Sequence, residues 1–469
     1  MAREKTKLNL TDESRSPVRI ILYLTWPLFL EQILTTLVSY ADTAMVGALG
    51  VNATASVSIS NSFVFLINGV VMALGVGITA YVARSVGAKD YEAAKAYIRH
   101  ALLLLLYVGV PLSFLMIGLH RLIPQWMGAE PEIMDTAANY LLITSCFRIC
   151  NLAMMMLGGV FRGRGDTKTP LYINIAVNII NVVGNYLLIN PTHELPLFST
   201  TMTIPGAGLG VTGAALSTGF SWLVGAVLII SLLYIKKDPT RIHPRDSMRL
   251  DRPLVRRVVD ISVPAMLERF CMSTASIVFS RAVASLGTVV FAANSVYITA
   301  ESISFMPGFA FATAATTLVG QSLGAGKPEL AKKFAWKTVQ VGALILTFTG
   351  AMIYIFARPL VSFFTPDPDA IELAVICLHQ VAFIQPVQVT AWILAGALRG
   401  AGDTKWPFYI TAICNWGIRT LGAWFCIRIF GLGLPEAVLC ACADCAVRAL
   451  LTWLRFRTGK WQNVLEKKA

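Results

Sequence analysis

The chain has 469 residues, of which 56% are hydrophobic and only 14% are charged, and its mean hydropathy is +0.65. Soluble domains carry nearer ~25% charged residues, so this composition excludes an ordinary water-soluble protein and favours one that faces lipid. Lys and Arg outnumber Asp and Glu by 39 to 26. In a membrane chain such an excess serves topology, and we expect no nucleic acid partner.

Twelve apolar stretches are each long enough to cross the ~30 Å hydrocarbon core of a bilayer. A polar N-terminal tail, 1–17, precedes them. The first half contains predicted spans at 18–46, 54–83, 97–121, 133–160, 170–190 and 211–235. The second half contains predicted spans at 256–284, 291–319, 334–358, 370–398, 407–429 and 436–457. The chain is thus expected to be an all-α integral membrane protein.

These spans form two units, which are followed by a C-terminal tail, 458–469. The N-terminal unit covers 18–235 and the C-terminal unit 256–457, with a basic, proline-bearing linker at 236–257 between them. Most of the Lys and Arg residues lie in the two tails, the linker and alternate loops. Because cytoplasmic loops carry such an excess, we expect a multi-pass protein of the inner (plasma) membrane with both termini cytoplasmic.

The chain contains an internal sequence repeat. Phe161–Pro170 has the sequence FRGRGDTKTP, and Leu398–Pro407, 237 residues later, has LRGAGDTKWP. The same offset aligns SVGAKDYEAAK, from Ser85, with SLGAGKPELAK, from Ser322. Six spans per copy place both copies the same way up, and parallel repeats of this kind are typical of transporters with a substrate site between the halves.

These duplicated motifs resemble those of the multidrug and toxic compound extrusion (MATE) transporters. PLFLEQILTTLVSYADTAMVGALG resembles the first helix of that family, and FMPGFAFATAATTLVGQSLGAG resembles its eighth. The resemblance extends from about residue 18 to 457. It implies a V-shaped, two-lobe bundle of twelve helices that exports drugs or other organic, cationic compounds in exchange for Na⁺ or H⁺. We expect a monomer in the lipid bilayer with no cofactor other than this coupling ion.

Asp42, in the first span, is the strongest candidate for the coupling site, because acids within a bilayer are costly and functional by default. The resemblance assigns an aspartate at this position to a cation site of the N-lobe, with partners from the fifth helix. Asn178, Asn181 and Asn185 share one face of that helix. Thr218 of the sixth span would add a hydroxyl. The sequence leaves Na⁺ at Asp42, Asn181 and Asn185 and a proton on Asp42 as alternatives.

Five further residues are candidates for the substrate cleft. Glu31 and Glu268 occupy equivalent positions of the repeat, and we expect both near the central axis. The simpler alternative pairs Glu268 with an arginine of a neighbouring helix. Glu301 is a third acid, and His379 and Gln385 lie in a tenth span without a mid-helix acid. The chain therefore fits neither the NorM-like nor the DinF-like pattern, and a second cation site in the C-lobe stays open.

The leading hypothesis is a secondary active multidrug efflux antiporter that works by alternating access. The alternative is a flippase for a lipid-linked precursor, which would need a more basic central cavity, whereas the candidate cleft residues here are mostly acidic. We expect no enzymatic activity, because the chain contains no Walker motif and no catalytic constellation. We also expect no metal site at Cys440, Cys442 and Cys445, which lie in one predicted helix without a nearby histidine.

Overall fold

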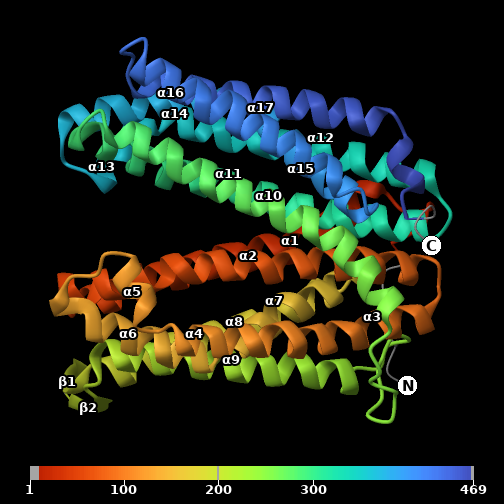
Figure 1. Ribbon diagram of the computed structural model, residues 1–469, viewed down its shortest axis with the longest axis horizontal. Helices are drawn as coiled ribbons and strands as arrows, with labels where there is room; N and C mark the ends of the chain where they lie inside the picture. Colours follow the sequence, from red (N-terminus) through yellow and green to blue (C-terminus); the bar gives the residue numbers. More distant parts are fainter. Residues whose placement is uncertain (1–9, 198–199, 466–469) are drawn as a thin grey trace.

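The computed structural model describes residues 10–197 and 200–465, and they are almost entirely helical (Figure 1). Positions 1–9 and 466–469 of the two predicted tails lie outside the described residues. The helices run roughly parallel in two lobes, which lie one above the other in Figure 1. The first and last described residues, Leu10 and Leu465, lie beside Gly165 and Gly402 of the two GDTK motifs, and this end of the bundle is here called the terminal end.

The N-lobe contains the helices that precede the linker. They are α1 (Pro17–Gly47), α2 (Val51–Gly87), α3 (Tyr91–Leu104), the π-helical turn η1 (Leu105–Gly109), α4 (Val110–Gly118), α5 (Leu122–Trp126), α6 (Pro131–Cys146), α7 (Arg148–Gly163), α8 (Lys168–Ile189) and α9 (Gly210–Ile235). A two-stranded antiparallel hairpin, β1 (Pro191–Leu197) and β2 (Thr200–Ala207), joins α8 to α9. The sequence did not predict this hairpin, which fills the connection after the fifth span.

The C-lobe repeats the N-lobe plan without the hairpin. Its elements are α10 (Arg252–Ala284), α11 (Thr288–Gly324), α12 (Pro328–Ile355), α13 (Ala357–Phe364), α14 (Pro368–Gly400), α15 (Lys405–Ala412), the π-helical segment η2 (Ile413–Thr420), α16 (Leu421–Arg428), α17 (Leu434–Arg457) and the 3₁₀ turn η3 (Lys460–Asn463). The fold prediction of an all-α bundle in two repeats is confirmed.

Several predicted spans are built from more than one helix. The fourth span consists of α6 and α7, which meet at an angle of 52°, and α11 bends by 49° near its middle. Among the described residues, eight helices are long and apolar enough to cross a membrane, or ten if each bent pair counts as one span. The remaining two predicted spans correspond to α10, which carries many charges, and to the interrupted run α15–η2–α16, and neither is among those helices.

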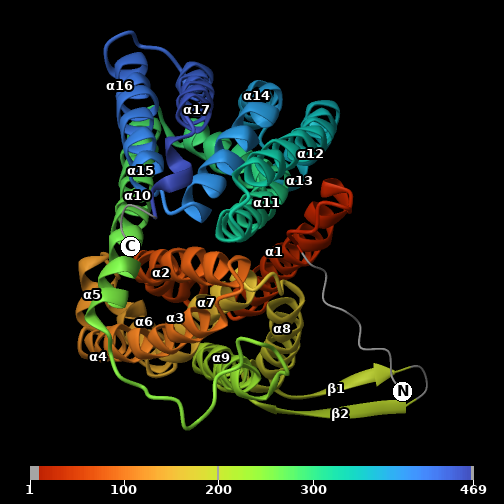
Figure 2. The same ribbon diagram turned by 90° about the vertical axis from the view of Figure 1, so that its right-hand side faces the viewer.

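The two lobes meet along α2 and α11. These two helices pack against each other, α10 also packs on α2, and α1 also packs on α11. The end-on view shows α2 and α11 facing each other between the lobes (Figure 2). Near the terminal end their backbones approach so closely that a Cβ added to Gly87 would overlap the backbone of Gln321. A Cβ added to Gly324, the repeat equivalent of Gly87, would likewise overlap the backbone of Arg84.

The duplicated GDTK motifs form turns at the terminal end. Gly165 and Gly402 adopt φ values of +78° and +81°, which favour glycine. Asp166 accepts a hydrogen bond from the backbone N–H of Thr169 (3.2 Å), as expected for a residue that caps α8. Asp403 instead accepts hydrogen bonds from the Arg455 guanidinium at 2.9 and 2.6 Å. Both motifs therefore have a structural role, because they stabilise the short turns between helices.

Candidate cation site and central cavity

Asp42 lies inside the N-lobe, where α1 faces α8 and α9. Asn185 donates its Nδ2 hydrogen to Asp42 Oδ1 at 2.6 Å. In the amide orientation that satisfies both of its neighbours, Asn181 donates to the same oxygen at 2.8 Å and accepts from Thr218 at 3.2 Å. Both asparagines are buried, with 1% of Asn185 and 4% of Asn181 exposed. The structure thus brings together four of the five residues that sequence predicted for the coupling site.

Close packing of α8 on α9 holds this group in place. Ser217 donates to the backbone oxygen of Asn181 (2.8 Å). Gly184 lies opposite Ser217, and a Cβ added there would come within 2.5 Å of the Ser217 hydroxyl oxygen. The glycine lets the two helices approach, and the hydroxyl fixes the height of Asn181 relative to Thr218.

A cavity of about 120 Å³ opens beside Asp42. Polar residues that the sequence analysis missed contribute much of its lining: Ser39, Thr43, Thr54, Ser58, Asn61 and Tyr140. Thr54, Ser58 and Asn61 recur at i, i+4 and i+7 on one face of α2, which was the available signal, but only the packed structure shows that this face lies beside Asp42. The cavity is large enough for an ion or a few waters next to the carboxylate.

Asn178 is not among the residues that contact Asp42. Its side-chain Nδ2 is buried without a hydrogen-bond partner in the described part of the chain. Asn174, one turn earlier on α8, reaches a different acid and donates to Glu31 Oε1 at 2.8 Å. The polar face of α8 therefore serves two separate carboxylates, Glu31 toward the terminal end and Asp42 further along.

Glu31 and Glu268 form equivalent ion pairs, one in each lobe. Arg162 Nη2 lies 3.6 Å from Glu31 Oε1, and Arg399 Nη2 lies 2.5 Å from Glu268 Oε1. Each arginine is the first one in its GDTK motif. Thr411, the repeat equivalent of Asn174, donates to Glu268 at 3.3 Å. The pairing of Glu268 with an arginine of a neighbouring helix, which was the simpler of the two expectations, is what the structure shows.

A central cavity of about 230 Å³ lies between the lobes. Glu268 lines it, whereas Glu31 does not, although its partner Arg162 does. The charged residues around the cavity are four arginines and one glutamate, namely Arg162, Arg269, Arg399, Arg448 and Glu268. The expectation of a mostly acidic cleft is therefore wrong. Arginines within predicted spans were the available signal, and the sequence analysis weighed the acids instead.

The other three cleft candidates lie within the C-lobe, away from the residues that line this cavity. Glu301 accepts a hydrogen bond from Gln388 and lies close to the Arg419 guanidinium. Gln385 is fully buried, and both polar atoms of its amide lack partners among the described residues. His379 contacts the backbone oxygen of Tyr354 at 3.2 Å and stacks on its ring.

The described residues also contain no cluster of His, Cys, Asp and Glu suited to a metal ion.

A family model described as MatE matches residues 27–187 and 264–425, one segment in each lobe. Together the two segments cover more than half of the chain. The chain belongs to the MatE family. This MatE protein is accordingly a multi-pass membrane transporter and not an enzyme, as its helices and relatives agree.

Relatives and solved structures extend this assignment over nearly the whole MatE chain. A protein of Thermotoga maritima named "Probable multidrug resistance protein NorM" is 28% identical over 450 residues, which are 94% of this chain and 93% of the relative. An "FAD transporter" of Shewanella oneidensis is 26% identical over 71% of both chains. A structure described as "Outward-facing conformation of a multidrug resistance MATE family transporter of the MOP superfamily" matches with a TM-score of 0.87 over 98% of both chains, at 21% identity, which shows the shared fold.

Proposed function

We propose that this MatE transporter is a secondary active antiporter that exports organic compounds in exchange for Na⁺ or H⁺ bound at Asp42. The observation that carries the proposal is the packing of a carboxylate and two amides beside a small polar cavity, deep in one lobe. Membrane acids that face a bundle interior mark ion pathways. Here the acid lies beside a small polar cavity within the N-lobe.

One atom of this site favours a bound cation in particular. Asn185 Oδ1 is buried and has no hydrogen-bond partner among the described residues. An amide oxygen in that situation is costly, and it is a ligand that Na⁺ accepts readily. The Asp42 carboxylate, Asn185 Oδ1 and the Thr218 hydroxyl would then supply oxygen ligands. A proton on Asp42 is the competing coupling ion, and it would leave Asn185 Oδ1 free to accept a hydrogen bond from the acid.

Alternating access would follow from the contact between the lobes. At the terminal end, Thr317 of α11 donates to the Arg162 backbone oxygen (3.0 Å) and Gln321 donates to the Gly163 backbone oxygen (2.8 Å). These two bonds join the C-lobe to the last turn of α7. Export requires them to break so that the central cavity opens to the terminal end, and a cation at Asp42 would favour one of the two states.

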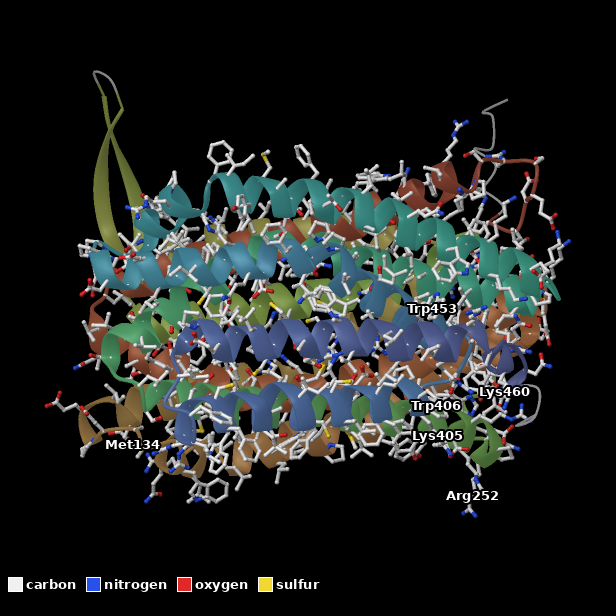
Figure 3. The ribbon with its side chains drawn as sticks, turned by 90° about the horizontal axis from the view of Figure 1, so that it is seen from above. Met134, Arg252, Lys405, Trp406, Trp453 and Lys460 are labelled. Atoms are coloured by element: carbon white, nitrogen blue, oxygen red, sulfur yellow. The ribbon has the colours of Figure 1, made fainter. Side chains whose placement is uncertain are left out.

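The terminal end is proposed to face the cytoplasm of a cell whose inner membrane holds the protein. Arg252, Lys405, Trp406, Trp453 and Lys460 gather at this end, whereas Met134 lies at the other (Figure 3). Basic residues beside interfacial tryptophans are typical of a cytoplasmic membrane boundary. Cysteines introduced into the 236–257 linker should then resist membrane-impermeant thiol reagents in intact cells. Efficient labelling from outside would reverse the orientation.

The substrate is proposed to be an organic compound, and its charge is the finer question. The family resemblance implied cationic compounds and the acidic cleft candidates favoured them, whereas the charged residues that line the central cavity are mostly arginines. The names of the relatives, multidrug resistance proteins and an FAD transporter, leave the charge open. A lipid-linked precursor flippase is not favoured, because the family match and the relatives are those of multidrug transporters.

The test is substrate efflux from proteoliposomes with Na⁺ and pH gradients imposed separately. An inward gradient of one of the two ions should accelerate efflux several-fold over the rate without a gradient. The matched control is empty liposomes in the same gradients. Efflux that responds to neither ion would refute antiport, and efflux that needs ATP would place the protein in another class.

A further inference from the structure

The charges around the central cavity do not balance. Three of its four arginines have a carboxylate partner: Arg162 has Glu31, Arg399 has Glu268, and Arg448 has Asp444, which is itself 0% exposed. The fourth, Arg269 on α10, forms no hydrogen bond or ion pair among the described residues. The nearby charges that act on it are the Arg399 guanidinium and the Glu268 carboxylate. Arg269 and Arg399 therefore share one acid, and the group lacks one negative charge.

An arginine in this position remains charged, because its guanidinium does not lose its proton in proteins. An uncompensated charge in a low-dielectric interior is costly, and a membrane protein retains one where it contacts water, ions or a substrate. The planar guanidinium presents paired N–H donors that match a carboxylate or a phosphate. An anion that enters the cavity would supply the missing partner.

The repeat shows that this charge is a departure from the common plan. Glu31 and Glu268 are equivalent, and the residue after each is Gln32 in the N-lobe and Arg269 in the C-lobe. The fold therefore accepts a neutral amide at this position of the helix. Only the copy on α10, which packs against α2 at the junction of the lobes, carries the cation.

The rest of the cavity wall is apolar and aromatic. Phe309 and Trp392 stack with their ring centroids 4.7 Å apart, and Met72, Met155 and Met272 complete this wall. Methionine adapts to different shapes, and aromatic faces accept planar rings. The cavity thus combines one unpaired cation with a soft apolar wall, which suits an amphipathic anion.

We infer that the central cavity binds aromatic organic anions, with their carboxylate or phosphate on Arg269 and their ring against the Phe309–Trp392 wall. This inference rests on the proposed export of organic compounds and names their class. An organic cation in the same cavity would meet Arg269 and Arg399 with only Glu268 to attract it. Glu268 is in turn held by Arg399 at 2.5 Å.

The test compares three probes that share one ring and differ in charge: 2-naphthoate, 2-naphthamide and 2-naphthylmethylammonium. Equilibrium dialysis of the purified full-length protein measures their binding without any ion gradient, so failed coupling at Asp42 would not affect the result. The wild type should bind 2-naphthoate at least about tenfold more tightly than the ammonium analogue. Tighter binding of the ammonium probe, or no binding of any probe, would overturn the inference.

Arg269→Gln introduces the residue that the N-lobe repeat already carries. Loss of one buried charge-assisted contact should weaken 2-naphthoate binding by about ten- to a hundredfold. Binding of 2-naphthamide should change less than about threefold. Arg269→Lys should retain part of the preference for 2-naphthoate over the ammonium probe. If Arg269→Gln does not fold, this variant provides the test of the site. Arg252→Gln removes the same charge at the terminal end and should leave all affinities unchanged. Unaltered 2-naphthoate binding by Arg269→Gln would refute the site.

Two kinds of anion have this chemistry, a lipid head group and a soluble aromatic anion. Octyl phosphate distinguishes them, because it has the head-group chemistry of a lipid but no ring. Binding about tenfold weaker than that of 2-naphthyl phosphate would support a soluble aromatic anion. Equal binding that Arg269→Gln abolishes would retain the anion site and refute the aromatic part. Equal binding in both proteins would refute the site as a whole.

Discussion

The two lobes share one plan near the terminal end and differ in their far halves. Near the terminal end both lobes keep a glutamate paired with an arginine, Glu31 with Arg162 and Glu268 with Arg399. Further along, Asp42 of α1 is matched by Phe279 of α10 at the same offset of 237 residues. Phe279 is buried and has the Arg419 guanidinium 5.1 Å above its ring. Both copies thus have the ion pair, whereas only the N-lobe copy has an acid at this position of the repeat.

The helices opposite these residues differ in the same way. The N-lobe segment that matches the family model is 27–187, and its C-lobe counterpart, 264–425, is one residue longer. The π-helical segment η2 (Ile413–Thr420) lies in that counterpart, and a π-helical turn accommodates one extra residue. Beyond it, the C-lobe has no pair of amides like Asn181 and Asn185. We therefore propose that the coupling chemistry belongs to one lobe, although both share a fold.

The largest expected difference in stability between the lobes comes from their ion pairs. Glu268→Gln leaves Arg399 and Arg269 as two neighbouring guanidiniums without a carboxylate, and it should cost about 3–5 kcal/mol, as breaking a buried pair does. Glu31→Gln breaks a longer contact of 3.6 Å and keeps Asn174 as a partner, so about 1 kcal/mol is expected. Melting temperatures of the purified variants measure both. Equal losses would show that the two pairs are interchangeable.

Within the N-lobe, the asparagines should rank by their distance from Asp42. Asn185→Ala removes a direct partner at 2.6 Å and should raise the cation concentration for half-maximal efflux by about tenfold. Asn178→Ala is the matched control on the same helix, and a change of less than about threefold is expected, because it has no contact with Asp42. A larger effect of Asn178→Ala would move the ion site along α8.

The smallest expected effect on stability concerns Asp166, in the GDTK turn of the N-lobe. Burial alone would raise the pKa of Asp166, but its hydrogen bonds to Lys236 and Thr169 and the Lys236 charge hold that pKa below its usual value of 3.8. A carboxylate with a depressed pKa stabilises the fold above its unfolded pKa, and this stability is lost as the pH falls through the folded value. Asp166→Asn should therefore cost about 1 kcal/mol at pH 7.

That cost should begin to fade in thermal melts as the pH falls below about 3.8, and it should disappear below the depressed pKa of folded Asp166, where the wild-type carboxyl is protonated as well. Asp135→Asn, at an exposed position of α6, is the control. A cost that does not change with pH would mean that the shape of the turn matters and the charge does not.

Local patterns were sufficient to predict the fold, and together with the family resemblance they predicted that Asn181 and Asn185 lie beside Asp42. The apolar spans, the offset of 237 residues and the shared face of Asn181 and Asn185 are all properties of contiguous sequence. The central cavity depends instead on how α10 packs against α2 across the lobe interface. No spacing within α10 reveals that Arg269 borders the cavity, and the hairpin after α8 has no counterpart in the second repeat. These features arise from tertiary contacts between distant segments.

The most direct test of a single coupling lobe compares Asp42→Asn with Glu301→Gln in proteoliposomes at matched protein density. Each variant removes one partly buried carboxyl, the first in the N-lobe and the second in the C-lobe. Asp42→Asn should show no acceleration of efflux by the gradient of the coupling ion, while Glu301→Gln should respond as the wild type does. Wild-type gradient-driven efflux by Asp42→Asn, with loss in Glu301→Gln, would place the coupling in the C-lobe and contradict this account.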